Sequence, residues 1–159
     1  MKTILAPVDF SAASEAVAKE AAALACTFDG RVVLLTVVQS PPIINEYAGM
    51  IDLAELAAAS EKNAARQLEA LEEKLKNQFV RAESVQATGN PVSLILEEAE
   101  KQQADYIVMG SHGHTAFYDL LVGSTSHGVL MRARCPVIIV PAAKESAPRP
   151  KTAKRMRLA

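Results

Sequence analysis

Two short segments rich in glycine and hydroxyl side chains carry the clearest chemical signal in this chain. They are Gly110-Ser111-His112-Gly113 and, after nine intervening residues, Gly123-Ser124-Thr125-Ser126. Glycine allows the backbone to approach a ligand closely and to adopt positive φ angles. We expect Ser124 or Thr125 to cap a helix whose free N–H groups would then attract an anion. The two segments, called the glycine motif below, therefore predict a phosphate-binding cradle.

Other phosphate-binding and catalytic patterns do not stand out in the sequence. It contains neither the Gly-Lys-Ser/Thr of a P-loop nor the dinucleotide fingerprint G-x-G-x-x-G. No nucleophile elbow, Ser-His-Asp order, paired carboxylates or evident base for phosphoryl transfer is recognisable either. We therefore expect a binding site with at most weak catalysis.

The glycine motif must be held in place by the strands and helices around it. Its first segment follows the apolar run 105–109, which predicts a buried strand, and its second opens a helix over 124–132. We expect Ser11 to cap the first helix, and Asn90 with Pro91 to begin the third. Strands that alternate with helices predict a parallel sheet covered on both faces, while the residues alone leave the strand order open. The other expected strands are 3–8, 31–38, 80–87 and 136–140, and the second helix is expected at 52–77.

The G-x2-G-x9-G-S/T spacing resembles the ATP-binding branch of the universal stress protein family. The resemblance extends over about residues 1–141 and includes the segments 4–11, 32–38 and 135–141. It implies a single doubly wound α/β domain over residues 1–143, similar to adenine nucleotide alpha hydrolases, with a five-stranded parallel sheet in the order 3-2-1-4-5. Strands 1 and 4 are then neighbours, and a ligand would bind beyond their carboxyl ends.

The resemblance also implies which residues bind a nucleotide. Asp9 follows the first strand, where its carboxylate would accept hydrogen bonds from the ligand or lie near a phosphate-bound metal; the alternative is that it caps the next helix. The ligand implied is ATP or another adenine nucleotide, with or without Mg2+ or Mn2+. The adenosine pocket would be lined by Pro7, Val8, Asp9 and Val37, the nucleotide would also contact Met109, Gly110 and Gly113, and its phosphates would be held by Gly123, Ser124, Thr125 and Ser126.

Three residues depart from the commonest family pattern. His114 stands where the family often has arginine, and His127 and Gly128 stand where polar, better helix-forming residues are usual. Histidine in place of arginine removes a permanent positive charge near the phosphates, and glycine inside a helix costs about 1 kcal/mol relative to alanine. We expect these changes to affect ligand affinity more than the identity of the site. With His112, the histidines lack cysteine or carboxylate partners at a recognised metal spacing. We expect no metal site, and a modest effect of histidine charge on ligand binding.

The distribution of charge separates a body from a tail. The chain has 17 basic and 18 acidic residues, and residues 144–159 contain six of the basic and one of the acidic ones. The body is thus left with 11 basic and 17 acidic residues, a net charge of −6, which argues against a nucleic-acid-binding core. We expect the basic tail to be disordered. No apolar run approaches the length of a membrane span, and no leader precedes the first strand, so we expect a cytoplasmic protein with reduced Cys26 and Cys135.

Three functions remain open from the sequence. The first is a nucleotide-binding module that acts in the stress response through conformation or through an unknown protein partner. The second is a slow ATPase or phosphotransferase that uses the same pocket, and the third is a nucleotide-independent dimeric stress protein. The final strand, 137–140, is uniformly apolar and would lie at a sheet edge, so we expect it to form a homodimer.

Overall fold

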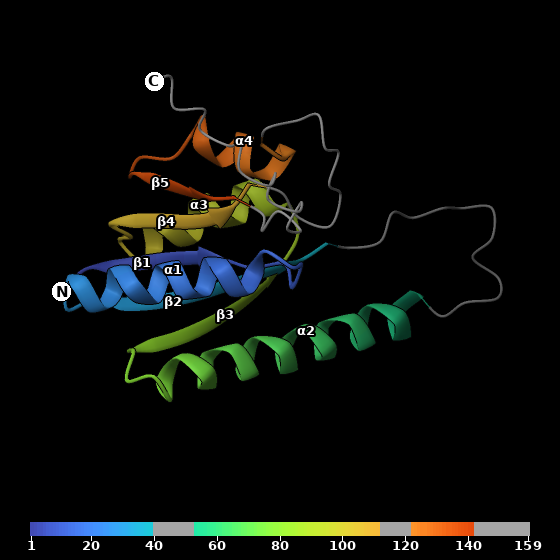
Figure 1. Ribbon diagram of the computed structural model, residues 1–159. Coiled ribbons are helices and arrows are strands. Elements are labelled where there is room, and N and C mark those ends of the chain that lie inside the picture. The colour runs from blue at the N-terminus through green and yellow to red at the C-terminus, as the bar shows by residue number, and fades with distance from the viewer. Residues whose placement is uncertain (40–52, 112–121, 142–159) are drawn as a thin grey trace, which may run out of the picture.

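Strands and helices alternate along the whole described part of the chain. The computed structural model describes residues 1–39, 53–111 and 122–141 (Figure 1). Gly113, His112, His114 and the basic tail at 144–159 therefore lie outside the described residues. The strands are β1 (Thr3–Pro7), β2 (Arg31–Val38), β3 (Ala82–Thr88), β4 (Tyr106–Gly110) and β5 (Val137–Val140), and the helices are α1 (Ser14–Thr27), α2 (Leu53–Lys76), α3 (Pro91–Lys101) and α4 (Ser124–Leu130).

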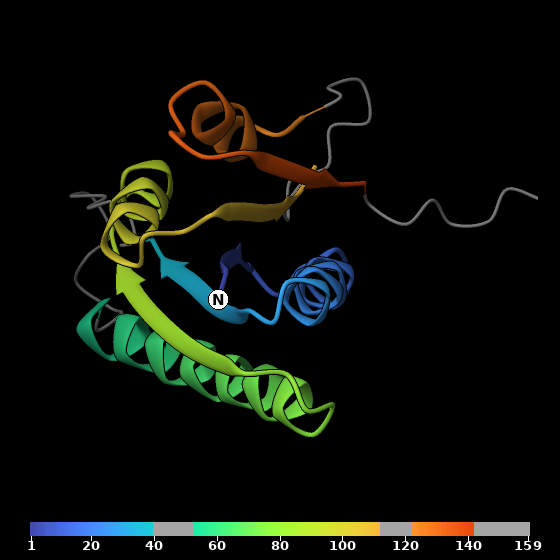
Figure 2. The ribbon, with the colours of Figure 1, turned by 90° about the vertical axis from the view of Figure 1, so that its left-hand side faces the viewer.

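The five strands form one parallel sheet in the order β3-β2-β1-β4-β5. This order confirms the fold implied by the family resemblance. Helices α1 and α2 cover one face and α3 and α4 cover the other, as Figure 2 shows. Since every crossover returns the chain to a parallel strand, all five strands end at the same edge of the sheet, called the carboxyl edge below.

Alternate residues of each strand pack into two separate cores. Ile4 and Val108 belong to the core beneath α1 and α2, whereas Leu5 and Ile107 belong to the core beneath α3 and α4. Successive side chains of a strand point to opposite faces, so a strand covered on both faces must be apolar throughout. This explains why the inner strands are continuous apolar runs in the sequence.

The first helix begins later than the sequence indicates. We expected Ser11 to cap it, and this is wrong: α1 begins at Ser14, with Ala13 at the N-cap position and no side-chain cap. The carbonyl oxygen of Ser11 instead accepts a hydrogen bond from the backbone N–H of Ser14 at 3.0 Å. The chain therefore makes an extra turn between β1 and α1, at the carboxyl edge of the sheet.

The start of α3 agrees with the sequence. Asn90 is the N-cap residue, and its Oδ1 accepts a hydrogen bond from the backbone N–H of Ser93 at 3.1 Å. Pro91 occupies the first helical position, where the N–H that proline lacks has no partner inside the helix. Both signals act within one turn of the chain, so the sequence is sufficient to predict them.

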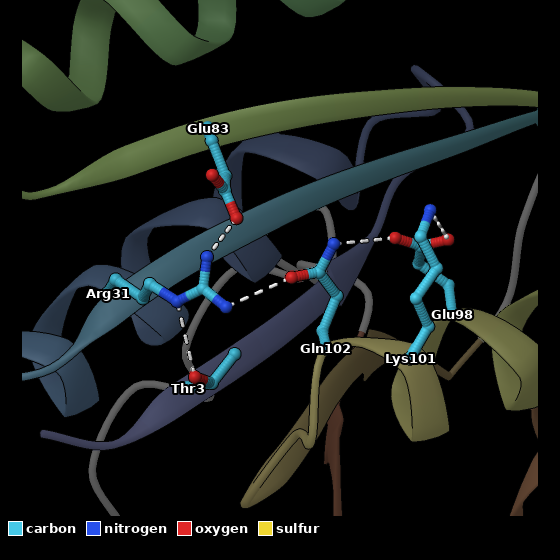
Figure 3. A network of polar contacts seen from close by, with 6 residues as sticks. All are labelled: Thr3, Arg31, Glu83, Glu98, Lys101 and Gln102. Carbon is cyan, nitrogen blue, oxygen red and sulfur yellow. Dashed lines mark hydrogen bonds and ion pairs between the residues drawn. The ribbon is translucent and has the colours of Figure 1, made fainter.

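A network of polar side chains ties three strands and α3 together at the opposite edge of the sheet, where the strands begin (Figure 3). Arg31 donates from Nε to Thr3 Oγ1 at 3.3 Å and from its terminal nitrogen to Gln102 Oε1 at 2.9 Å, and it forms an ion pair with Glu83. Gln102 donates in turn to Glu98 Oε1 at 2.7 Å. The three contacts of the guanidinium thus hold the amino edge of the sheet together.

Candidate functional site

The candidate site lies at the carboxyl edge, between the neighbouring strands β1 and β4. The chain leaves β1 toward β2 on one side, whereas β4 continues toward β5 on the other. Parallel α/β sheets bind ligands at such a reversal, because the loops diverge there and leave a crevice. Asp9 follows β1 and Ser111 follows β4, so this topology brings the two most motif-like parts of the sequence to one place.

Two hydrogen bonds join the two segments of the glycine motif. The backbone N–H of Gly123 donates to the carbonyl oxygen of Ser111 at 2.6 Å. The hydroxyl of Ser126 donates to the carbonyl oxygen of Gly110 at 2.7 Å. Ser111 is itself fixed, because its N–H donates to the carbonyl oxygen of Val140 at 2.8 Å. The start of α4 is therefore held directly against the ends of β4 and β5.

The start of α4 carries no side-chain cap. We expected Ser124 or Thr125 to cap the helix, and this is wrong: Gly123 occupies the N-cap position and no side chain accepts a hydrogen bond there. The N–H groups of Ser124, Thr125 and Ser126 consequently have no acceptor among the described residues. Unpaired donors at a helix start suit a phosphate oxygen, and they are the strongest chemical feature of this edge.

Gly123 does not use the conformational freedom of glycine. Its φ of −65° and ψ of 160° are angles that any residue adopts. A positive φ was one reason that we gave for glycine in the motif, and it does not apply at this position. What remains is the absence of a side chain, which lets a ligand approach the backbone.

Ser126 has a structural task in the motif. It is 5% exposed, and its hydroxyl hydrogen is donated to the carbonyl oxygen of Gly110. The hydroxyl hydrogens of Ser124, which is exposed, and Thr125, which is half-buried, have no such acceptor among the described residues. In this arrangement Ser126 offers a ligand its backbone N–H, while Ser124 and Thr125 offer both groups.

The turn after β1 is organised by Asp9. Its Oδ1 accepts hydrogen bonds from the backbone N–H of Ser11 at 3.0 Å and from the hydroxyl of Ser14 at 3.2 Å. Phe10 between them has a φ of 60°, a left-handed conformation that is uncommon for a bulky residue. Strained backbone of this kind often lies at functional sites. The exposed Asp9 carboxylate therefore shapes the turn at the carboxyl edge. The alternative that Asp9 caps the next helix is wrong, because no side chain caps the start of α1.

The other expected pocket residues lie at the same edge but on different faces of the sheet. Pro7 ends β1 and Val8 follows it, with its side chain in the core beneath α1 and α2. Val37 and Met109, near the ends of β2 and β4, pack on the core beneath α3 and α4. Alternation along the strands thus places Val8 on one face of the sheet and Val37 and Met109 on the other.

Comparison with known proteins identifies the family. The profile of the Universal stress protein family matches residues 1–141. The chain belongs to the universal stress protein family. Universal stress protein MJ0531 of Methanocaldococcus jannaschii is 34% identical over 141 residues, which are 87% of this chain and 81% of that protein.

Solved structures of family members share the fold. UspA from Lactobacillus plantarum superposes with a TM-score of 0.78 at 26% identity, over 87% of this chain and 97% of that one. The universal stress protein from Archaeoglobus fulgidus in complex with dAMP superposes with a TM-score of 0.60 at 19% identity, over 87% of this chain and 96% of that one. The second likeness concerns the fold alone.

Gly128, one of the departures from the usual universal stress protein pattern, has a packing role. A Cβ at this position would lie 2.9 Å from Cγ2 of Val92 and 3.2 Å from its Cγ1. Contacts below about 3 Å do not occur between packed carbon atoms, so glycine allows α4 to lie close against α3. Sequence reasoning counted only the helix propensity of Gly128 and missed this contact, because Val92 is distant in the chain.

Metal-binding and membrane-spanning features were sought in residues 1–39, 53–111 and 122–141. No group of three potential metal-binding side chains occurs there. His127 is exposed in α4. Within the same ranges, no helix combines the length and the apolar character needed to cross a membrane. Cys26 and Cys135 are both free thiols, and burial raises the pKa of the Cys135 thiol, which makes it less reactive at neutral pH.

Proposed function

We propose that this protein is an adenine-nucleotide-binding module that acts in the stress response through nucleotide-dependent conformation or through binding of a protein partner. The ligand is ATP or another adenine nucleotide, with or without Mg2+ or Mn2+. The observation that supports the proposal is the run of N–H groups at residues 124–126, which have no acceptor among the described residues and are held beside Gly110 at the switch point of the sheet.

The proposed roles follow from the position of each group. The phosphates accept hydrogen bonds from the backbone N–H groups of Ser124, Thr125 and Ser126. Gly123 lets them approach because it has no side chain, and Gly113 completes the cradle. The nucleoside lies across the ends of β1, β2 and β4, against the backbone of Pro7 and Val8, the carboxylate of Asp9, and Val37, Met109 and Gly110. The Archaeoglobus fulgidus protein holds dAMP on the same fold, but the proposal depends on the residues of this chain.

Nucleotide released from the purified protein provides the first test. Denaturing the protein and identifying the released ligand by mass spectrometry should yield an adenine nucleotide. Calorimetry should then show binding of ATP to the wild-type chain and its loss in Gly123→Val, since a branched side chain would fill the space of the phosphates. Gly123→Ala is the matched control for folding, because the backbone angles suit alanine. Wild-type affinity in Gly123→Val would show that the site is misplaced.

Hydrolysis is expected to be slow, which separates this proposal from the ATPase or phosphotransferase alternative. Among the described residues, the loop after β1 and the two segments of the glycine motif contain no lysine to assist phosphoryl transfer, and the Asp9 carboxylate accepts two hydrogen bonds within its own turn. Turnover above roughly one per second, the low end of ordinary enzyme rates, would contradict the binding module. A protein that neither releases nor binds any nucleotide would instead support a nucleotide-independent dimer.

We further propose that the protein is a homodimer through β5. Among the strands that the structure describes, β5 pairs with β4 alone, so its outer backbone groups lie at the edge of this sheet. Its four residues are apolar and half-buried, and no lysine discourages pairing with another strand. Ile139→Lys should give a soluble monomer in light scattering, with Lys19→Glu, an exposed charge change on α1, as the control. A wild-type chain that is monomeric at high micromolar concentration would overturn the proposal.

A further inference from the structure

Large apolar side chains are exposed mainly at the amino edge, where the strands begin. Of the six large hydrophobic residues exposed in the described part of the chain, five lie at the N-terminus or at the turns that lead from helices into strands. The N-terminus and these turns lie on one side of the fold, the left-hand side of Figure 1, which faces the viewer in Figure 2. Apolar side chains that gather on one exposed surface are typical of an interaction site. The five, called the amino-edge residues below, are Met1 (78% exposed), Phe28 (41%), Phe79 (98%), Leu130 (46%) and Met131 (70%).

Phe79 stands at a position where the fold does not need its side chain. After α2, the N–H of Val80 donates to the carbonyl oxygen of Leu75 at 3.2 Å and the N–H of Phe79 to that of Lys76 at 2.9 Å, which are the bonds of a Schellman turn. Phe79 has a φ of 62°, the left-handed conformation for which such turns favour glycine. Gln103 occupies the same position after α3, with a φ of 51°, so a polar residue serves the fold equally well. The exposed phenyl ring therefore indicates a role outside the fold.

Arg81 holds three of the amino-edge residues close together. Its guanidinium lies 3.2 Å from the sulfur of Met1 and 3.2 Å from Oδ1 of Asp29, the residue after Phe28. Arg81 itself follows Phe79 by two residues. The N-terminus and the turns after α1 and α2 thus form one surface, in which a cation lies among exposed apolar side chains.

Positive charge gathers at the same edge. Residues 1–3, 27–31, 76–82, 101–106 and 130–137, which are the N-terminus and the four turns with their flanking residues, contain seven basic and two acidic residues. The rest of residues 1–143 contains four basic and fifteen acidic residues. Arg81, Lys101 and Arg134 pair with carboxylates, but their side chains are 60%, 69% and 85% exposed. Exposed ion pairs contribute little to stability, so phosphate groups can replace these carboxylates.

We propose that the amino edge binds the surface of a membrane that contains anionic lipids. Lysine and arginine of the turns bind the headgroup phosphates, and the amino-edge residues enter the apolar boundary beneath them. The apolar side chains come from four separate places in the chain. A fluid interface accepts protruding side chains wherever they stand, whereas a folded protein needs a matching pocket for each. This mode of binding requires no membrane-spanning helix, and it does not depend on the nucleotide site, which lies at the opposite edge.

A tryptophan reporter shows which edge meets the lipid. The chain contains no tryptophan, so one can be placed at either end of the fold. Phe79→Trp reports on the amino edge, and Leu56→Trp, near the start of α2 on the carboxyl side, is the matched control because Leu56 is also exposed. The vesicles consist of phosphatidylcholine alone or with about 30% phosphatidylglycerol. Emission of Phe79→Trp should shift to shorter wavelength and be quenched by brominated lipid in the anionic vesicles only, and Leu56→Trp should show neither effect.

Removal of the phenyl ring measures its contribution. Phe79→Gln copies the residue that stands after α3, so it should fold like wild type. It should weaken co-sedimentation with anionic vesicles about 5- to 20-fold, because a phenyl ring is no longer buried in the lipid. Leu56→Gln is the control and should bind like wild type, and urea denaturation checks that both variants are folded.

Removal of charge measures the contribution of the cations. One variant replaces Arg81, Lys101 and Arg134 by glutamine, and it should bind the anionic vesicles about 10- to 100-fold more weakly. Its control changes the net charge by the same amount with residues that are exposed on α1 and α2, away from the turns, and should stay within about threefold of wild type. The difference should largely disappear at about 0.5 M salt. The control residues are Lys19, Lys62 and Arg66.

Three outcomes would overturn the inference. A wild-type chain that stays in solution with the anionic vesicles would exclude lipid as the partner of this surface. Binding without a shift of the Phe79→Trp emission would show that another part of the chain, such as the basic tail, meets the membrane. Equal losses in the two charge variants would show that binding follows net charge and not the amino edge.

Discussion

Replacement of Ser124 by proline would remove one backbone N–H from the proposed cradle with little change to the fold. Ser124 is the first residue of α4, a position where proline is favoured because its fixed φ suits a helix. The residue before a proline is restricted to extended angles, and Gly123 already has a φ of −65° and a ψ of 160°. The N–H that would be lost has no acceptor among the described residues, so folding should lose no hydrogen bond.

The size of the effect follows from the kind of hydrogen bond that is removed. A hydrogen bond to a charged phosphate oxygen contributes roughly 1.5–3 kcal/mol, which corresponds to about a 10- to 150-fold increase in Kd. Ser124→Pro should therefore weaken ATP by this factor and leave adenosine unchanged. Ser124→Ala keeps the N–H and loses only the hydroxyl, so its affinity should remain within about fivefold of wild type.

Calorimetric titration of the two variants, together with their free energies of unfolding, tests whether the N–H of Ser124 binds the phosphates. Ser124→Pro should unfold within about 1 kcal/mol of wild type, because a compatible proline mainly restricts the unfolded chain. Binding of ATP by Ser124→Pro with wild-type affinity would refute the assignment of this N–H to the phosphates. An equal loss of adenosine and ATP would instead indicate distortion of the whole site.

Two further predictions concern stability. Gly128→Ala should lower the free energy of unfolding by about 1 kcal/mol, because the close contact of the new Cβ with Val92 outweighs the better helix propensity of alanine. In a Val92→Ala background the same substitution should raise the free energy of unfolding, and equal effects in the two backgrounds by urea denaturation would contradict the contact. The hydrogen bonds from Lys2 and from the backbone N–H of Thr3 hold the pKa of Asp105 below its usual value. The ionised carboxylate therefore stabilises the fold above about pH 4, and this stabilisation is lost as the pH falls through the lowered pKa. Asp105→Asn should therefore lose less stability than wild type on acidification from about pH 5 to pH 2, and parallel profiles would refute this origin.

Features that depend on neighbours in the chain could be predicted from the sequence. Asn90 and Pro91 begin α3 as expected, since capping acts within one helical turn. The inner strands β1, β2 and β4 were recognisable because a strand buried on both faces is largely apolar. The spacing of the glycine motif indicated the family, and the family resemblance supplied the strand order that the residues alone left open.

Features that depend on distant partners were decided only by the tertiary structure. The hydroxyl of Ser126 and the carbonyl oxygen of Gly110 meet because α4 folds back on the end of β4. Helix α1 begins at Ser14 and not directly after Ser11, because the carboxylate of Asp9 organises the turn between β1 and α1.

The sheet face and the packing contacts of single residues also depend on distant parts of the chain. Val8 and Met109 lie in different cores because alternation along two paired strands sets the face of each side chain, and this requires the register between the strands. Gly128 looked unfavourable by helix propensity alone, yet the side chain of Val92 on another helix occupies the space of its missing Cβ. Propensity, capping and apolar patterning act over a few residues and can be read along the chain. Hydrogen bonds between loops, the choice of face and close helix packing depend on the positions of chain segments that only folding brings together.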